Sequence, residues 1–236
     1  MSSMQKSFEL EKFLKLIKKL EKYNKKSFFI FYYIKNERIE YMSYKEGNEI
    51  TVRVQCSKED LIKRIQEDNF VLKSEYRSKD IFMIPKDIDI MKTNTREILS
   101  KAILLREFQG ISSNKHKMKI TFKHKDINEK GEILSQNSTN CEVTNIHDAQ
   151  RLFENIGYKE LMSIKEKHFA YCRNGFEIII KILSDDNILI EAELNKEYKT
   201  IDELKNAINK TKIPFDKSNY FVKKAEEELD KIKNRR

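Results

Sequence analysis

Residues 158–194 read YKELMSIKEKHFAYCRNGFEIIIKILSDDNILIEAEL, and this stretch contains three apolar-rich runs separated by two turn signals. The first turn is Asn174-Gly175, and both residues tolerate the positive φ that a type I′ hairpin turn requires. The second turn is Ser-Asp-Asp-Asn at 184–187, whose side chains can hydrogen-bond their own backbone. The stretch therefore predicts an antiparallel meander of three strands.

Paired charges lie along the first and third strands of this meander. Because side chains alternate between the two faces of a strand, Lys165 and Lys167 share one face of the first strand. Glu191 and Glu193 likewise share one face of the third strand. A barrel or a deep sheet that brings these charges together could hold a metal-bound phosphate. A solvent-facing sheet would show the same alternation, so this stretch alone leaves both interpretations open.

The composition indicates a globular chain with a basic surface. Its 236 residues fit one large domain, or one domain with an extension. Lys and Arg number 47 against 38 Asp and Glu, which gives a formal net charge of +9. This balance favours polyanionic partners such as nucleotides, nucleic acid or membrane surfaces. The chain contains 5 Gly and 2 Pro, which argues against long disordered linkers.

The cysteines and the apolar runs exclude other classes of protein. Cys56, Cys141 and Cys172 are far apart and lack a C-x-x-C spacing, so neither a disulfide framework nor a zinc site is expected. No stretch approaches the roughly 18 apolar residues of a membrane span, and the start of the chain lacks an apolar signal core. We therefore expect a cytoplasmic protein with reduced thiols and no membrane partner.

The chain before the meander alternates between predicted helices and strands. Residues 3–23 carry an apolar stripe typical of a helix, and SFFIFYYI at 27–34 followed by 37–46 predicts a β-hairpin. Strict alternation in EITVRVQC at 49–56 predicts a strand with one polar face. Ser57, with an acidic residue three positions later, predicts the start of a helix.

A lysine-rich strand is predicted at 117–125, where KMKITFKHK alternates strictly between polar and apolar residues. Lys119, Lys123 and Lys125 share one of its faces, where they repel one another unless an anion or an acidic group lies nearby. A solvated face is the alternative, because water and salt screen the repulsion. The preceding predicted strand carries Arg106.

Helix signals between the strands complete the predicted fold. Apolar residues favour a helix at 145–156, a Thr200-x-x-Glu203 capping box begins another, and a charged helix ends the chain. The pattern of strand, capped helix and strands occurs at 49–84 and again at 140–182. We therefore predict an α+β fold in which two such halves close an antiparallel β-barrel, with helices packed outside and a polar lumen.

Short motifs along these strands follow one order. They are Glu49-x-Thr51-x-Arg53, Asp80-Ile81-Phe82, Leu105-Arg106, Thr121-Phe122-Lys123, Glu142, Lys165-Glu166-Lys167 and Glu191-Ala192-Glu193. In this order and spacing, the chain resembles the CYTH family over roughly residues 49–194. That family includes class IV adenylyl cyclases, thiamine triphosphatases and inorganic tripolyphosphatases, and its members are also called triphosphate tunnel metalloenzymes.

The resemblance implies a tunnel domain at 47–236 that follows an extension at 1–46. It implies that a triphosphate-bearing small molecule, such as a nucleotide, thiamine triphosphate or tripolyphosphate, binds to basic side chains in the lumen. The substrate-binding residues would be Arg53, Arg106, Lys119, Lys123, Lys165 and Lys167. The cofactor would be Mg²⁺ or Mn²⁺, which prefer oxygen ligands. The metal ligands would be Glu49, Glu142, Glu191 and Glu193.

The chain departs from the family pattern at several positions. Thr51 and Thr144 stand where carboxylates are expected, and Lys181 stands near a usual aspartate. Asn140 and Phe108 replace arginines. Two functions therefore remain open, and no catalytic residue is assigned. One is a metal-dependent phosphohydrolase or adenylyl cyclase, and the other is a nucleotide- or polyphosphate-binding module without turnover.

Other features of the sequence do not add a site. His168 shares a face with Ile164 and Glu166, and ordinary packing is expected for it. The net charge also suits a nucleic-acid binder, but aromatic residues cluster at 28–33 rather than alternating with a basic stripe, and no recognised binding motif occurs. Residues 1–46 could support a homodimer or cap one mouth of the barrel.

Overall fold

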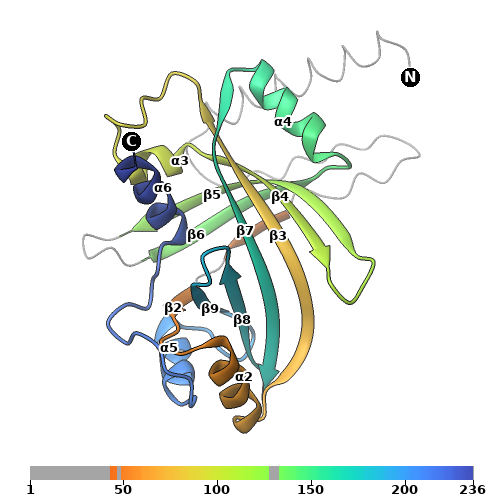
Figure 1. Ribbon diagram of the computed structural model, residues 1–236, viewed down its shortest axis with the longest axis vertical. Coiled ribbons are helices and arrows are strands. Elements are labelled where there is room, and N and C mark those ends of the chain that lie inside the picture. The colour runs from red at the N-terminus through yellow and green to blue at the C-terminus, as the bar shows by residue number, and fades with distance from the viewer. Residues whose placement is uncertain (1–42, 47–48, 128–132, 236) are drawn as a thin grey trace. The chain divides into compact units, whose positions relative to one another are not determined.

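The computed structural model describes residues 43–46, 49–127 and 133–235 (Figure 1). The chain divides into two units, residues 1–39 and residues 40–236, and every described residue belongs to the second unit. The helix and the first strand of the hairpin that the sequence predicts before residue 43 lie outside the described residues. Their structure stays a prediction.

Within the described residues, nine strands form one antiparallel sheet in the order β1-β6-β5-β4-β3-β7-β8-β9-β2. Their bounds are β1 (Ser43–Glu46), β2 (Glu49–Arg53), β3 (Val71–Pro85), β4 (Ile103–Gly110), β5 (His116–Ile127), β6 (Ile133–Glu142), β7 (Tyr158–Arg173), β8 (Phe176–Leu183) and β9 (Ile188–Glu193). β1 pairs with β6, so residues 43–46 belong to the sheet although the sequence assigned them to the N-terminal extension.

The predicted meander is confirmed as strands β7, β8 and β9. Asn174 and Gly175 have φ of 47° and 76°, the left-handed conformation that a type I′ turn between β7 and β8 requires. In the turn between β8 and β9, the side chain of Asp185 accepts a hydrogen bond from the backbone N–H of Asn187 at 3.3 Å. Local turn chemistry therefore helps to set the register of these strands.

The two edge strands of the sheet are neighbours in the sequence. β1 ends at Glu46 and β2 begins at Glu49, so at most about 11 Å of chain joins the two edges. This short connection requires the sheet to curve strongly. The hydrogen-bonded order nevertheless ends at β1 and β2, which do not pair with each other within the described residues. The closed barrel predicted from the sequence is therefore not formed in this part of the chain.

The free edge of β2 pairs with the C-terminal segment instead. The backbone N–H of Thr51 donates to the carbonyl of Tyr220 at 2.9 Å, and the carbonyl of Thr51 accepts from the N–H of Val222 at 2.9 Å. Val54 forms an antiparallel bridge with Phe215. These bonds use the backbone groups of β2 that closure of the sheet would require, which explains why the barrel stays open.

The two faces of the sheet differ in what covers them. We call the face that carries Asp80, Arg106 and Glu191 the inner face, and the opposite face the outer face. α2 (Lys58–Glu67), α4 (Ile146–Asn155) and α5 (Ile201–Asn209) pack on the outer face, as predicted (Figure 1). The predicted N-cap of α2, Ser57, accepts a hydrogen bond from Asp60 N–H, and the Thr200-Glu203 capping box opens α5. Apolar residues of alternate strand positions, such as Ile50, Val52, Ile81 and Met83, fill this interface.

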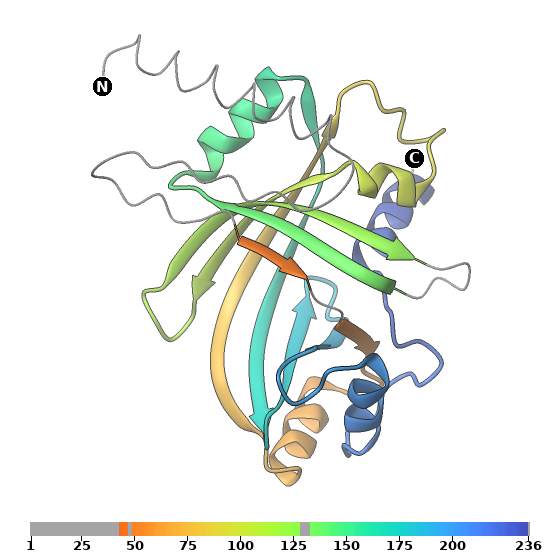
Figure 2. The same ribbon diagram turned by 180° about the vertical axis from the view of Figure 1, so that it is seen from behind.

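Two further helices lie on the inner face, where the sequence predicted a polar lumen. α3 (Thr95–Ser100) and α6 (Lys224–Asn234) lie side by side (Figure 2). Their residues Ile98 and Leu229 are fully buried with the inner-face residues Phe82, Leu104 and Ile164. The prediction that helices pack outside is therefore wrong for these two, because one end of the inner face is apolar and needs a cover.

Candidate functional site

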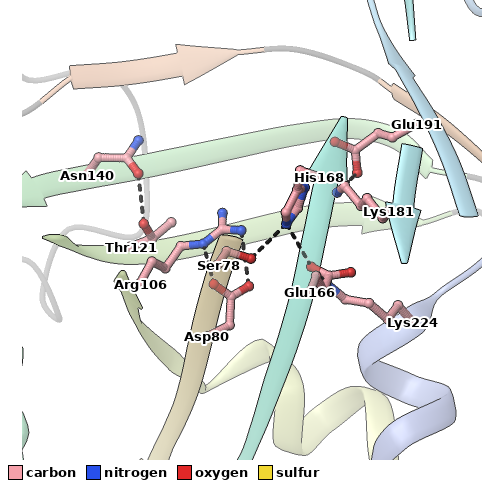
Figure 3. Close-up of polar contacts among 10 residues, drawn as sticks. All are labelled: Ser78, Asp80, Arg106, Thr121, Asn140, Glu166, His168, Lys181, Glu191 and Lys224. Carbon is pink, nitrogen blue, oxygen red and sulfur yellow. Dashed lines mark hydrogen bonds and ion pairs between the residues drawn. The ribbon is translucent and has the colours of Figure 1, made fainter. Parts of the chain in front are cut away.

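The register of the sheet brings polar side chains from eight strands, β2 to β9, onto the inner face, and Figure 3 shows several of them. Residues directly opposite in an antiparallel pair point to the same face, and this rule extends from strand to strand. The polar inner-face residues are Glu49, Thr51, Arg53, Tyr76, Ser78, Asp80, Arg106, Lys117, Lys119, Thr121, Lys123, Ser138, Asn140, Glu142, Glu166, His168, Lys181, Glu191 and Glu193.

Three of the four predicted metal ligands lie together. One carboxylate oxygen from each of Glu49, Glu191 and Glu193 falls within 4.8 Å of the others. Glu49 lies directly opposite Glu193, and Thr51 lies directly opposite Glu191. The fourth predicted ligand, Glu142, stands on the inner face of β6, but it does not join this group. We refer to Glu49, Glu191 and Glu193 as the carboxylate cluster.

Lys181 inserts its ammonium group into this region. Its Nζ forms an ion pair with Glu191, and both side chains are only 12% exposed. Burial acts to raise the pKa of Glu191, but the charges of Lys181 and Lys123 overcome it and lower that pKa to about 2. Burial acts to lower the pKa of Lys181, while Glu191, Glu166 and Glu49 raise it above its usual value. Both members of this buried pair are therefore charged, Lys181 as an ammonium and Glu191 as a carboxylate.

A second buried ion pair positions the predicted substrate-binding Arg106. Its Nε and Nη2 donate to the two oxygens of Asp80 at 2.9 and 3.0 Å, a bidentate geometry that fixes the guanidinium plane. The side chains are 14% and 3% exposed. Burial acts to raise the pKa of Asp80, but Arg106 and Lys224 lower it below its usual value. The guanidinium also lies 5.2 Å from the ring centre of Phe108.

The remaining basic residues of the inner face follow β2 and β5. Lys119 lies directly opposite Arg106 on β5, and its Nζ is 5.3 Å from the Phe108 ring centre. Lys123 lies two inner-face positions further along β5, close enough to lower the pKa of Glu191. Arg53 on β2 donates to Asn187 at 3.1 Å and to Glu227 at 2.6 Å. All four predicted basic residues on β2, β4 and β5 therefore share this face.

Lys165 and Lys167 do not reach this site. They lie directly opposite Lys79 and Arg77 on the outer face, where both are exposed and line a groove of about 590 Å³. The inner positions of this part of β7 belong to Glu166 and His168. A shift of one residue moves every side chain of a strand to the other face. The sequence prediction placed β7 one residue out of register in this way, so it assigned the inner positions to Lys165 and Lys167.

The sequence reasoning missed a buried network around His168. The Nε2 of His168 lies 2.7 Å from the Oγ of Ser78, and the imidazole stacks on Tyr76 with ring centres 4.5 Å apart. Glu166 accepts a hydrogen bond from Lys224 of α6 at 2.6 Å. Burial, with the charges of Lys181 and Lys224, lowers the pKa of His168 to about 3, so the imidazole is neutral near pH 7.

Two atoms of this network are unsatisfied. The Nδ1 of His168 and the Oε1 of Glu166 are buried and have no hydrogen-bond partner within the described residues. The signal in the sequence was the alternation of Met162, Ile164 and Ala170. These apolar residues are buried on the same face as Glu166 and His168, which points both polar side chains inward.

The comparisons with known proteins concern the fold. No family model matches the chain, and no curated protein matches it in sequence. Among solved structures, the PH1819 protein from Pyrococcus horikoshii OT3 is similar, with a TM-score of 0.55 and 18% identity over 79% of this chain and 99% of that one. A "putative adenylate cyclase" from Vibrio parahaemolyticus is similar with a TM-score of 0.53 and 14% identity over 78% of this chain and 97% of that one.

The chain has a CYTH-like fold. The CYTH-like sheet supplies the strands on which the carboxylate cluster and the inner-face cations stand. No helix of the described ranges combines the length and the apolar character that crossing a membrane requires.

Proposed function

We propose that this chain binds a triphosphate-bearing small molecule on the inner face of its CYTH-like sheet. One observation carries the proposal: Arg106, Lys119 and Lys123 share a face with the carboxylate cluster. Lys and Arg donate charge-assisted hydrogen bonds to phosphate oxygens, and Arg can do so in two places at once. A nucleotide, thiamine triphosphate or tripolyphosphate would suit such a set of donors.

The carboxylate cluster is the proposed site of one Mg²⁺ or Mn²⁺. Three carboxylate oxygens within 4.8 Å suit a hard cation. Thr51 opposite Glu191 offers no further carboxylate, and Glu142 instead pairs with Lys117 at 3.3 Å. The residues therefore fit one ion rather than two. When bound, the ion would neutralise charge on the phosphate and orient the attacking oxygen.

The protein's own side chains would bind and hold the phosphate chain. Asp80 holds the Arg106 guanidinium in one orientation, so little conformational entropy is lost when it meets a phosphate. Lys119 and Lys123 are only partly buried and would adjust to the ligand. The reaction that follows would be hydrolysis, in which water attacks and phosphate leaves, or cyclisation, in which a ribose hydroxyl attacks the α-phosphate and pyrophosphate leaves.

A second candidate function is binding without turnover. The ion pair of Lys181 with Glu191 favours it, because a lysine occupies one oxygen of a proposed metal ligand. Thr51, in place of a carboxylate, also removes a ligand from the same region. Both departures weaken metal binding, whereas the phosphate-binding cations of β4 and β5 remain.

Isothermal titration calorimetry with tripolyphosphate, ATP and thiamine triphosphate tests the proposed binding. At least one should bind in the presence of Mg²⁺, and Lys123→Ala should weaken that binding by roughly tenfold. Lys79→Ala is the matched control, because Lys79 lies on the outer face of the same sheet and its removal should leave the affinity unchanged. Failure of all three compounds to bind would refute the proposal.

Turnover is tested separately on the compound that binds. Release of phosphate and formation of cyclic nucleotide are followed with Mg²⁺ and with Mn²⁺, and Glu193→Gln serves as the metal-site variant. Turnover that Glu193→Gln abolishes supports the enzyme. Tight binding with neither product supports the binding module.

A further inference from the structure

Lys181 has an unusual place among the inner-face cations. It is bound to Glu191, a member of the carboxylate cluster, and its side chain is 12% exposed. Three carboxylates, Glu191, Glu166 and Glu49, act on its charge. Lys123 also acts on Glu191 and helps to lower its pKa. Lys181 therefore supplies a resident positive charge to the cluster through a direct ion pair with Glu191.

A divalent cation and the Lys181 ammonium require the same carboxylate. The ammonium already uses one oxygen of Glu191, and that residue contributes to the group of three oxygens that suits a cation. Positive charges a few ångströms apart in a buried site repel strongly, because the protein interior screens them less than water does. Binding of the cation therefore requires Lys181 to move or to find another partner.

We propose that Lys181 is a built-in cation that keeps the carboxylate cluster from binding a divalent ion until a phosphate-bearing anion draws its ammonium away. The second half of this inference rests on the proposed function. A lysine is suited to the task, because its ammonium sits on a flexible four-carbon stem and can turn from one anion to another. The residue directly opposite on β7 is His168, which is neutral near pH 7 and does not repel the moving ammonium.

Lys181 then has opposite effects on the two ligands. It weakens binding of the divalent ion alone and strengthens binding of the phosphate chain. The two ligands then bind cooperatively, since each removes an obstacle to the other, and this coupling is reciprocal by thermodynamic necessity. A lysine that only stabilised the fold would change the unfolding free energy without these opposite effects on binding.

The experiment titrates Mn²⁺ alone into the full chain by calorimetry, without any phosphate. Lys181→Met removes the charge, and Lys181→Gln removes it while keeping a hydrogen-bond donor for Glu191. Both should bind Mn²⁺ at least roughly tenfold more tightly than the wild type, whereas the outer-face control Lys79→Met should match the wild type. Equal or weaker Mn²⁺ binding by folded Lys181→Gln overturns the inference.

A second measurement uses the wild type and does not depend on the folding of any variant. The ¹³Cε signal of Lys181 in a lysine-labelled sample should shift when tripolyphosphate is added in EDTA. A bound tripolyphosphate that leaves this signal unmoved also overturns the inference. The Mn²⁺ arm separates the two proposals. Tighter Mn²⁺ binding by the variants, with no binding of tripolyphosphate, ATP or thiamine triphosphate, supports the competition and refutes the proposed function. Binding of tripolyphosphate together with an unchanged Mn²⁺ affinity of the Lys181 variants supports the proposed ligand and refutes the competition.

Discussion

Lys224, the first residue of α6, donates a hydrogen bond of 2.6 Å to the Oε2 of Glu166, which lies in the middle of β7. The two side chains are 16% and 1% exposed. This contact joins the C-terminal helix to the inner face of the sheet, near Asp80 and His168. The C-terminal segment therefore contributes both to the edge of β2 and to the electrostatic balance of the site.

Removal of Lys224 should destabilise the fold strongly. Lys224→Met leaves the carboxylate of Glu166 buried without its cation, and breaking such a pair costs about 3–5 kcal/mol. The unfolding free energy from urea titration at pH 7 measures the loss. The double variant Glu166→Gln/Lys224→Met should recover much of it, and Lys217→Met, at an exposed position, should stay within about 0.5 kcal/mol of the wild type. A Lys224→Met protein as stable as that control would contradict the argument.

Mild acid should also destabilise the protein, through His168. Its folded pKa is about 3, against 6.5 as the ordinary value, so between these two pH values the unfolded chain binds a proton that the folded chain does not. The contribution of His168 to the free energy of unfolding is therefore fully present above about pH 6.5. It falls as the pH is lowered, by at most about 1.4 kcal/mol per pH unit.

Urea unfolding at pH 7, 6 and 5 measures this slope. His168→Gln should flatten the slope, since no imidazole remains to be protonated in the unfolded state. His147→Gln, at an exposed position near the start of α4, should keep the wild-type slope. Equal slopes for the His168 and His147 variants would show that another group controls the acid response.

Short-range chemistry is what the sequence predicted well. The turn at Asn174-Gly175, the Ser57 cap and the Thr200-Glu203 capping box are each decided by a few neighbouring residues, and each is present. Strict alternation also placed Lys123 on the same face as Lys119, and Glu191 on the same face as Glu193, because it indicates which residues of one strand lie together.

Features that depend on distant segments could not be predicted in the same way. The open barrel results from hydrogen bonds of Thr51 to a segment 169 positions or more away in the sequence. The residues of β2 contain no pattern that predicts these hydrogen bonds. The ion pair of Lys224 and Glu166 spans 58 positions. The face of Lys165 was misassigned because alternation indicates only which residues of one strand share a face. Which of the two faces is the inner one depends on the pairing of β7 with β3, and this pairing contains two register shifts.

At lower pH, Glu191 should add a second loss of stability. Its folded pKa of about 2 lies below the ordinary 4.5, so this contribution is complete above about pH 4.5 and is lost as the pH falls toward 2. Glu191→Gln should make the decrease between pH 4.5 and 3 shallower in thermal unfolding experiments. Glu177→Gln, at an exposed position of the same sheet, should decrease like the wild type, and identical curves for both variants would contradict the prediction.

The two faces of the sheet should differ in their affinity for phosphate. In the double variant Lys119→Ala/Lys123→Ala, two inner-face charges are removed, and tripolyphosphate affinity should fall by roughly tenfold or more. In Lys165→Ala/Lys167→Ala, the same net charge is removed from the outer face, and the affinity should change by less than about twofold at 0.15 M salt, because charges beyond the Debye length are largely screened. Calorimetry on the two variants, matched in charge, separates local contacts from the long-range field. A larger loss in the outer-face variant would show that the ligand binds on the outer face and would contradict the proposed site.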